Sequence, residues 1–169
     1  PIEQLEQEDW ERTFSVNSTG HFLVTRAALR LFRRQGSGGN LVVIASKNVA
    51  APGPDFAAYS ASKAAEVQLA RVAAIEGGPM GVRVNVVNPD AVFGDSGLWS
   101  GGVREERARA HGIAPETLEE FYRARTLLGT EVRAEDVAEA VLFLASDRSS
   151  RTTGCVLPVD GGVREAFPR

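Results

Sequence analysis

Residues 46–63 read SKNVAAPGPDFAAYSASK, and the organisation of the whole chain follows from this stretch. It opens with Ser46 directly after an apolar run, continues through a loop rich in Pro and Gly, and ends with Tyr59 and Lys63 at the start of a helix. A spacing of four residues places a phenol and an ammonium on one helical face, one turn apart. A neighbouring cation favours phenolate over phenol. The pair is therefore suited to act as a general acid and base on an alcohol or a carbonyl.

The composition narrows the class of protein. The 169 residues are enough for one domain with a hydrophobic core. A net charge of -3 and a sequence pI near 5.5 argue against a nucleic-acid surface. No apolar run approaches the roughly 18 residues of a membrane span, and no signal peptide is visible. The single Cys155 and the two His residues lack metal-ligand spacing. We therefore expect a cytoplasmic protein that binds no metal, membrane or nucleic acid.

Helices and strands alternate along the chain. Apolar residues at three- and four-residue steps predict one long helix up to about residue 36, with a broad buried face. Strands are predicted at 41–45, 82–87 and, as an edge strand containing Pro158, at 155–160. Further helices are predicted at 56–76, 103–110, 115–125 and 134–146. This rhythm indicates an α/β fold with a parallel sheet of about three strands. Ser46 then lies at the carboxyl end of a buried strand, where ligands bind.

Two features leave alternatives open. Asn17 interrupts the apolar face of the first helix, either as a kink or packing position or as a polar group that faces a site and orders water. Residues 94–128 break the rhythm with glycines, Trp99 and short helices, and we call them the lid segment. They form either a lid over the site or a surface excursion. We favour the lid because the segment leaves the sheet at a strand's carboxyl end.

The two lysines of the chain, Lys47 and Lys63, both lie within residues 46–63, and every other basic residue is Arg. Because surface charge is supplied by Arg, a remaining Lys is expected to have a specific role more often than usual. We assign such a role to Lys63 and give Lys47 the lower priority.

Four features in the correct order show a resemblance to the short-chain dehydrogenase/reductase family. Tyr59 and Lys63 match its Tyr-x-x-x-Lys pair, and Ser46 lies at the usual distance before the Tyr. Asn17 lies in the helix before the Ser-bearing strand, and the run 159–162 (VDGG) is also typical. The whole chain resembles the C-terminal two-thirds of a member. The resemblance implies a single, incomplete NAD(P)-binding domain over 1–169, with part of a Rossmann-like, doubly wound parallel sheet.

The resemblance also implies roles for individual residues. Tyr59 would be the acid and base, Ser46 would bind the substrate oxygen, and Asn17 would order a water in a proton relay. Lys63 would act on Tyr59 and hold the nicotinamide ribose. The implied cofactor contacts are Tyr59, Lys63, Pro89, Asp90 and Val92, and the implied substrate contacts are Ser46, Asn48 and Trp99.

The chain departs from the family pattern in two places. The Gly-rich dinucleotide motif and the Asn-Asn-Ala-Gly strand, expected upstream, do not occur in the 169 residues. The chain therefore carries the catalytic half of a site and lacks most of the residues that would bind the cofactor. Asp90 follows Pro89 where the family has Gly, and Gly94 replaces a carboxamide-binding Thr. We expect the Asp90 carboxylate to meet the substrate or a neighbouring loop, and NAD to be the cofactor, with NADP left open.

The run 88–99, the charged run 104–108 and Phe121-Tyr122 resemble one subgroup more narrowly. This is the dehydrogenase domain of bifunctional proteins that fuse a rhamnulose-1-phosphate aldolase to a short-chain dehydrogenase and are linked to lactaldehyde oxidation with NAD. It implies a small hydroxy-aldehyde or alcohol substrate and a fused aldolase domain. The resemblance to the wider family implies a homo-oligomer formed through helices at about 8–34 and 59–76. The alternatives are a fragment that folds and dimerises without activity, and a sugar-nucleotide epimerase, which the lid segment and the VDGG run disfavour.

Overall fold

A three-stranded parallel sheet forms the centre of the computed structural model, which describes residues 1–94 and 96–167. Its strands are β1 (Gly39–Ile44), β2 (Val82–Pro89) and β3 (Val156–Val159), in the order β1-β2-β3. β1 pairs with β2 from Gly39↔Val82 to Ile44↔Val87, and β2 pairs with β3 from Val86↔Val156 to Pro89↔Val159. The predicted α/β class and parallel sheet are confirmed, and β3 is an edge strand as Pro158 requires.

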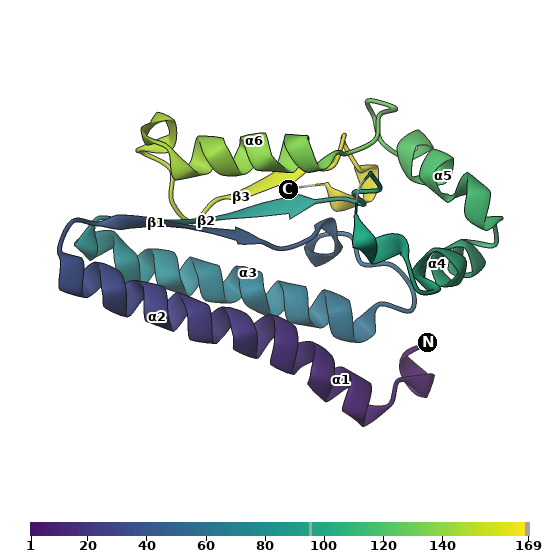
Figure 1. Cartoon of the computed structure of the whole chain (residues 1–169), viewed down its shortest axis with the longest axis horizontal. Helices are drawn as coiled ribbons and strands as arrows, with labels where there is room; N and C mark the ends of the chain where they lie inside the picture. The colour runs from purple at the N-terminus through teal and green to yellow at the C-terminus, as the bar shows by residue number, and fades with distance from the viewer. Residues whose placement is uncertain (95, 168–169) are drawn as a thin grey trace.

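Helices cover both faces of the sheet (Figure 1). α2 (Gly20–Gln35) and α3 (Ala57–Gly77) lie on one face, and α6 (Ala134–Ala145) lies on the other. The alanines of α3 favour the helix and let it approach β2 closely. The main core fills the space between them, and its buried members are Val43, Ala45, Val67, Ala70, Ala73, Ala74, Val82, Val84 and Val86. Within the described ranges, no helix combines the length and the apolar character needed to cross a membrane.

The long first helix forms as predicted, but with a different surface. α1 (Gln7–Phe14), a π-helical turn at Ser15–Thr19 and α2 follow one another without a break, and α2 ends at Gly36 in the left-handed conformation. The prediction of a broad buried face was wrong, because Thr25 is the one buried residue of α2. This helix packs on α3 and β1 from one side and leaves its outer side chains open, among them Phe22, Leu23, Val24 and Leu31.

The lid segment folds into short helices beyond the carboxyl ends of β1 and β2 (Figure 1). It contains α4 (Val103–His111) and α5 (Leu118–Ala124), with single 3-10 turns at Gly97–Trp99 and Pro115–Thr117. Asp95, within the predicted lid, lies outside the described residues. Phe93, Ala108 and Leu118 form a separate small core, and Trp99 stacks on Phe93 with 4.2 Å between ring centroids. The segment is therefore a packed unit attached to the end of β2.

Arg83 of β2 fixes α6 on the sheet. Its Nη1 donates to the carbonyl oxygen of Leu144 at 3.0 Å and to Ser149 Oγ at 2.8 Å, and its Nη2 donates to the carbonyl oxygen of Ser146 at 3.0 Å. These acceptors belong to the last turn of α6 and the turn after it, where carbonyl groups lack helical partners. These hydrogen bonds hold the turn after α6, from which the chain continues to β3.

Candidate active site

Ser46 follows β1 at the carboxyl end of the sheet. Its Oγ accepts a hydrogen bond from the backbone N–H of Asn48 at 3.2 Å, and the residue is buried. A hydroxyl can also donate, and no acceptor for the Ser46 proton occurs among the contacts of the described residues. Ser46 is therefore able to donate a hydrogen bond to the oxygen of a bound substrate.

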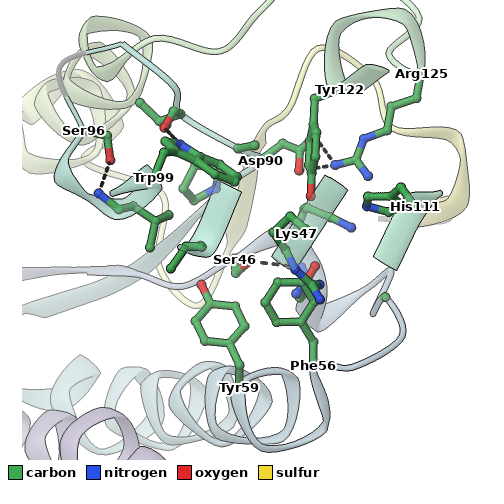
Figure 2. A pocket seen from close by; sticks show the side chains of 18 of the residues that line it. Ser46, Lys47, Phe56, Tyr59, Asp90, Ser96, Trp99, His111, Tyr122 and Arg125 are labelled. Carbon is green, nitrogen blue, oxygen red and sulfur yellow. Dashed lines mark hydrogen bonds and ion pairs between the residues drawn. The ribbon is translucent and has the colours of Figure 1, made fainter. Parts of the chain in front are cut away.

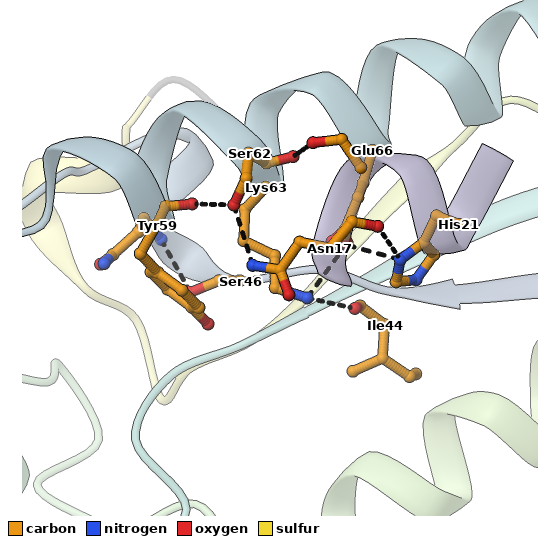
Figure 3. A network of polar contacts seen from close by, with 10 residues as sticks. Asn17, His21, Ile44, Ser46, Tyr59, Ser62, Lys63 and Glu66 are labelled. Atoms are coloured by element: carbon orange, nitrogen blue, oxygen red, sulfur yellow. Dashed lines mark hydrogen bonds and ion pairs between the residues drawn. The ribbon is translucent and has the colours of Figure 1, made fainter. Parts of the chain in front are cut away.

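Tyr59 and Lys63 lie in the first two turns of α3, on the side that faces Ser46 (Figure 3). The ammonium Nζ of Lys63 lies 5.9 Å from the centroid of the Tyr59 ring. Nζ donates to the carbonyl oxygen of Ile44 at 3.2 Å and to Glu66 Oε2 at 3.0 Å. An ammonium has three donors, so one of them is left for a ligand among the contacts described.

Asn17 lies in the π-turn, and its side chain joins the first helix to α3. Its Nδ2 donates to Ser62 Oγ at 2.9 Å, and Ser62 Oγ donates to the carbonyl oxygen of Tyr59 at 2.8 Å (Figure 3). The amide thus has a packing role, which was one of the two alternatives from the sequence. Ordering of water by Asn17 stays a prediction. The carbonyl oxygen of Asn17 lies 2.9 Å from Nδ1 of His21.

Glu66 is a fully buried carboxylate beside Lys63. Its Oε1 lies 3.2 Å from His21 Nδ1, without aligned hydrogen-bond geometry. A carbonyl and a carboxylate can only accept, so the Nδ1 of His21 carries a proton. Sequence reasoning missed His21 and Glu66. The sequence pattern that could have indicated them is a polar or charged residue at a helical position where the spacing of apolar residues predicts burial.

A pocket of about 360 Å³ lies between residues 46–59, the end of β2 and the lid segment (Figure 2). Most of the residues expected at the site line it, namely Ser46, Asn48, Tyr59, Pro89, Asp90, Val92 and Trp99. Asn17 and Lys63 are not part of this lining. The indole Nε1 of Trp99 donates to the carbonyl oxygen of Val92 at 2.7 Å, which turns the ring edge toward the backbone after β2.

Asp90 meets a neighbouring segment, one of the two partners expected for it. Both of its carboxylate oxygens lie 2.6 Å from Nη2 of Arg125, which follows α5. The guanidinium of Arg125 also lies over the ring of Tyr122, at 4.0 Å from the centroid. Burial, more than any charge, raises the pKa of Tyr122 above the usual tyrosine value, so this phenol stays neutral. Asp90 therefore fastens the lid segment to the end of β2.

Two further cations, Lys47 and Arg107, line the same pocket. Lys47 Nζ donates to the carbonyl oxygen of Ala51 at 2.9 Å. Arg107 lies over the ring of Phe56 at 3.9 Å from the centroid, and its Nη1 contacts the carbonyl oxygen of Pro54 at 3.5 Å. From the sequence, Lys47 had a lower priority than Lys63, and Arg107 was not singled out. Nothing in the charged run 103–110 distinguishes the inward Arg107 from its outward neighbours.

The residues present fit the nicotinamide and ribose end of an NAD(P) molecule. Pro89 and Val92 form part of an apolar wall at the carboxyl end of β2. The third N–H of Lys63 Nζ, which has no acceptor in the described part of the chain, can donate to a ribose hydroxyl. No Gly-rich phosphate loop occurs in the 169 residues, so the pyrophosphate end has no counterpart in them. When bound, a nicotinamide accepts or donates the hydride of the reaction.

Comparisons with known proteins show the family to which the chain belongs. A family model described as Enoyl-(Acyl carrier protein) reductase matches residues 1–164. The chain is 47% identical, over its full 169 residues, to Uncharacterized oxidoreductase YuxG of Bacillus subtilis, and it covers 24% of that protein. The sorbitol-6-phosphate 2-dehydrogenase SrlD from Erwinia amylovora superposes with a TM-score of 0.89 at 29% identity, covering 96% of this chain and 62% of that one.

A short chain dehydrogenase from Mycobacterium paratuberculosis, solved with NAD bound, gives a TM-score of 0.83 at 31% identity and covers 95% of this chain and 58% of that one. The chain thus spans about a quarter of YuxG and about three-fifths of the two solved chains. The family model matches nearly the whole chain, and the relatives include dehydrogenases of the same fold. The chain belongs to the short-chain dehydrogenase/reductase family.

Proposed function

We propose that the chain forms the catalytic part of an NAD(P)-dependent oxidoreductase that acts on a small hydroxy-aldehyde or alcohol. The observation that carries the proposal is the convergence of the Ser46 hydroxyl and the Tyr59 phenol on one pocket of about 360 Å³. Lys63 lies on the same helical face as Tyr59 and keeps a donor for a cofactor hydroxyl.

In the proposed oxidation, Ser46 donates a hydrogen bond to the substrate oxygen and Tyr59 removes the hydroxyl proton. A bound nicotinamide would supply the acceptor for the hydride of the carbon that bears this oxygen. An aldehyde reacts as its hydrate, whose gem-diol carbon offers both a hydroxyl proton and a hydride, so the product is a carboxylic acid. This route needs no thioester, in agreement with the position of Cys155, which is not among the lining residues of this pocket.

Lactaldehyde is the first substrate to test, because the sequence resembles the dehydrogenase domain of aldolase-fused proteins. YuxG is long enough to hold further domains, since the matched region accounts for 24% of that protein. The name of SrlD, a sorbitol-6-phosphate 2-dehydrogenase, supports an alcohol or carbonyl as the reacting group. The NAD-bound relative supports NAD as the cofactor, with NADP to be tested in parallel.

We also propose a homo-oligomer in the cytoplasm, formed through the long first helix and α3. The support is a set of exposed apolar side chains on these helices, which a second subunit would cover: Phe22, Leu23, Val24, Leu31, Val72 and Ile75.

The test uses the full-length gene product with NAD and lactaldehyde, followed by NADH absorbance. Tyr59→Phe should lower kcat by at least about 100-fold, the usual contribution of a positioned acid or base, while NAD binding persists. Absence of NADH with lactaldehyde and with a panel of small alcohols would refute the proposal. NAD titration of the 169-residue chain addresses the alternative of an inactive fragment, because tight binding by this chain contradicts it.

A further inference from the structure

The pocket carries more positive charge than its own carboxylate balances. Among the described residues that line it, Lys47, Arg107 and Arg125 are basic, and Asp90 is the one carboxylate. Asp90 is fully engaged by Arg125 through both oxygens. The Nε of Arg125 is buried and still has no acceptor among the described residues. Lys47 and Arg107 take part in none of the ion pairs of the described residues, although Asp55 lies near enough to Arg107, and Asp90, Glu165 and Asp160 near enough to Lys47, for their charges to interact.

Arg107 shows the imbalance most clearly. It is 8% exposed, and its guanidinium has five N–H donors, yet its one hydrogen bond in the described structure is the 3.5 Å contact with the carbonyl oxygen of Pro54. Stacking on Phe56 at 3.9 Å fixes the plane of the guanidinium and leaves its edge groups unused. Burial of a guanidinium with most of its donors unused carries a desolvation cost. An anion in the pocket would remove that cost.

Lys47 is a second cation that lines the pocket. Its Nζ has one acceptor, the carbonyl oxygen of Ala51, which leaves two donors. Burial first, and then Arg125, lower the pKa of Lys47, although Asp90, Glu165 and Asp160 act in the opposite direction. His111 adds no charge at neutral pH, because burial and then the cations Arg125, Arg107 and Lys47 lower the pKa of its imidazole.

The position of these cations relative to Tyr59 defines the shape of the ligand. The Phe56 ring is close to both Tyr59 and Arg107, with its centroid 5.6 Å from that of Tyr59 and 3.9 Å from the guanidinium carbon of Arg107. In Figure 2, Ser46, Lys47 and the rings of Phe56 and Tyr59 lie on one side, and Asp90, Tyr122 and Arg125 lie on the other. Tyr59, Lys47 and Arg107 all line this one pocket, so a single bound molecule can contact both the phenol and the cations.

We infer that this pocket selects substrates that carry a carboxylate or a phosphate, bound by Arg107 and Lys47, with the reacting hydroxyl or carbonyl held at Ser46 and Tyr59. The planar fork of an arginine matches both anions in bidentate geometry, and a lysine adds a point charge. This inference rests on the proposed oxidoreductase function and narrows it. Among small hydroxy-aldehydes and alcohols, anionic ones are the preferred substrates, and neutral lactaldehyde is a weaker one.

The experiment compares matched aldehydes in the full-length gene product with NAD. Glyceraldehyde is paired with glyceraldehyde 3-phosphate, and butanal is paired with succinic semialdehyde. The anionic member of at least one pair should have a kcat/KM at least about tenfold higher. Arg107→Gln should remove most of that preference, through KM, and Lys47→Gln should weaken it. Arg104→Gln is the matched control, because Arg104 lies on the same helix, pairs with Glu119 and does not line the pocket.

Each other outcome has a defined meaning. Equal turnover of charged and neutral members would overturn the inference and leave the proposed function intact. If Arg107→Gln raises the KM for NAD and keeps the substrate preference, the cations serve a cofactor phosphate, and the inference is wrong. If no substrate reacts, the proposed function fails, and calorimetric binding of inorganic phosphate and succinate still tests the anion site. Binding that both Arg107→Gln and Lys47→Gln abolish, in variants with unchanged circular dichroism, supports it; no binding to the wild type overturns it.

Discussion

Glu66→Gln is the substitution for which the structure permits the firmest estimate of a stability change. The Glu66 side chain has no solvent exposure, and that of Lys63 is 12% exposed. Their charged atoms are 3.0 Å apart, and His21 Nδ1 lies 3.2 Å from the other carboxylate oxygen. Removal of one partner from a buried pair costs about 3–5 kcal/mol. Gln keeps the shape and one acceptor for Lys63, so we expect a loss of about 2–3 kcal/mol.

Urea unfolding, followed by circular dichroism, measures this loss as a lower midpoint at unchanged slope. Glu76→Gln is the matched control, because Glu76 lies on the exposed side of the same helix and forms none of these contacts. We expect the control to stay within about 0.5 kcal/mol of the parent protein. A double-mutant cycle with Lys63→Met isolates the pair, and its coupling energy should reach about 1 kcal/mol or more.

Two results would refute this reasoning. A midpoint for Glu66→Gln that equals the midpoint of the control would show that the buried carboxylate does not stabilise the helix pair. Additive costs of Glu66→Gln and Lys63→Met would show that the two groups act separately. In either case, the position of Lys63 beside Tyr59 would depend on its hydrogen bond to the carbonyl oxygen of Ile44.

Three further predictions follow from other parts of the chain. The pKa of Lys47 is lower in the folded protein than its usual 10.5, so the unfolded chain binds this proton more tightly. The free energy of unfolding therefore increases as the pH rises from the folded pKa of Lys47 toward 10.5. Lys47→Met should remove this rise between neutral and alkaline pH; an unchanged slope contradicts the assignment. Gly38→Ala should destabilise the fold by at least about 1 kcal/mol more than Gly36→Ala. Both glycines have positive φ, but only a Cβ at Gly38 meets a backbone oxygen, that of Gly81 at 2.6 Å, and equal urea midpoints would disprove the clash. Ile75→Glu should lower the sedimentation mass of an oligomer without lowering the unfolding midpoint, and an unaltered mass excludes this face from the interface.

The order of elements was predictable because each one carries its burial pattern locally. The run 41–45 is apolar throughout and lies largely within β1, and four of the alanines of α3 are buried, namely Ala58, Ala70, Ala73 and Ala74. Ser46 was expected at a ligand site because it follows a strand of a parallel sheet, and ligands bind at the carboxyl ends of such strands. Tyr59 was expected beside it because it begins the next helix. The exposure of the first helix was not predictable in the same way, because periodicity shows which residues share a face and does not show what covers it.

The positive wall of the pocket could not be derived from the sequence. Lys47 and Arg107 come from a turn after β1 and from α4, and their meeting depends on how the lid segment folds back. No local sequence pattern predicts how the lid segment folds back. One Arg among many does not stand out as a pocket residue. The His21–Glu66 contact depends on the rotation of one helix against another, which the spacing of apolar residues defines only to within a turn.

The π-turn at Ser15–Thr19 sets the rotational phase between the two ends of the first helix. A residue added to a helix rotates everything before it by about 100° about the axis. α1 contacts α3, and Asn17 in the turn bonds Ser62 of the same helix. With one residue fewer, an uninterrupted α-helix could keep the packing of α1 or the bond of Asn17, but not both. The length of this segment is therefore as constrained as its sequence, and single-residue deletions within it should be tolerated less well than substitutions at the same positions.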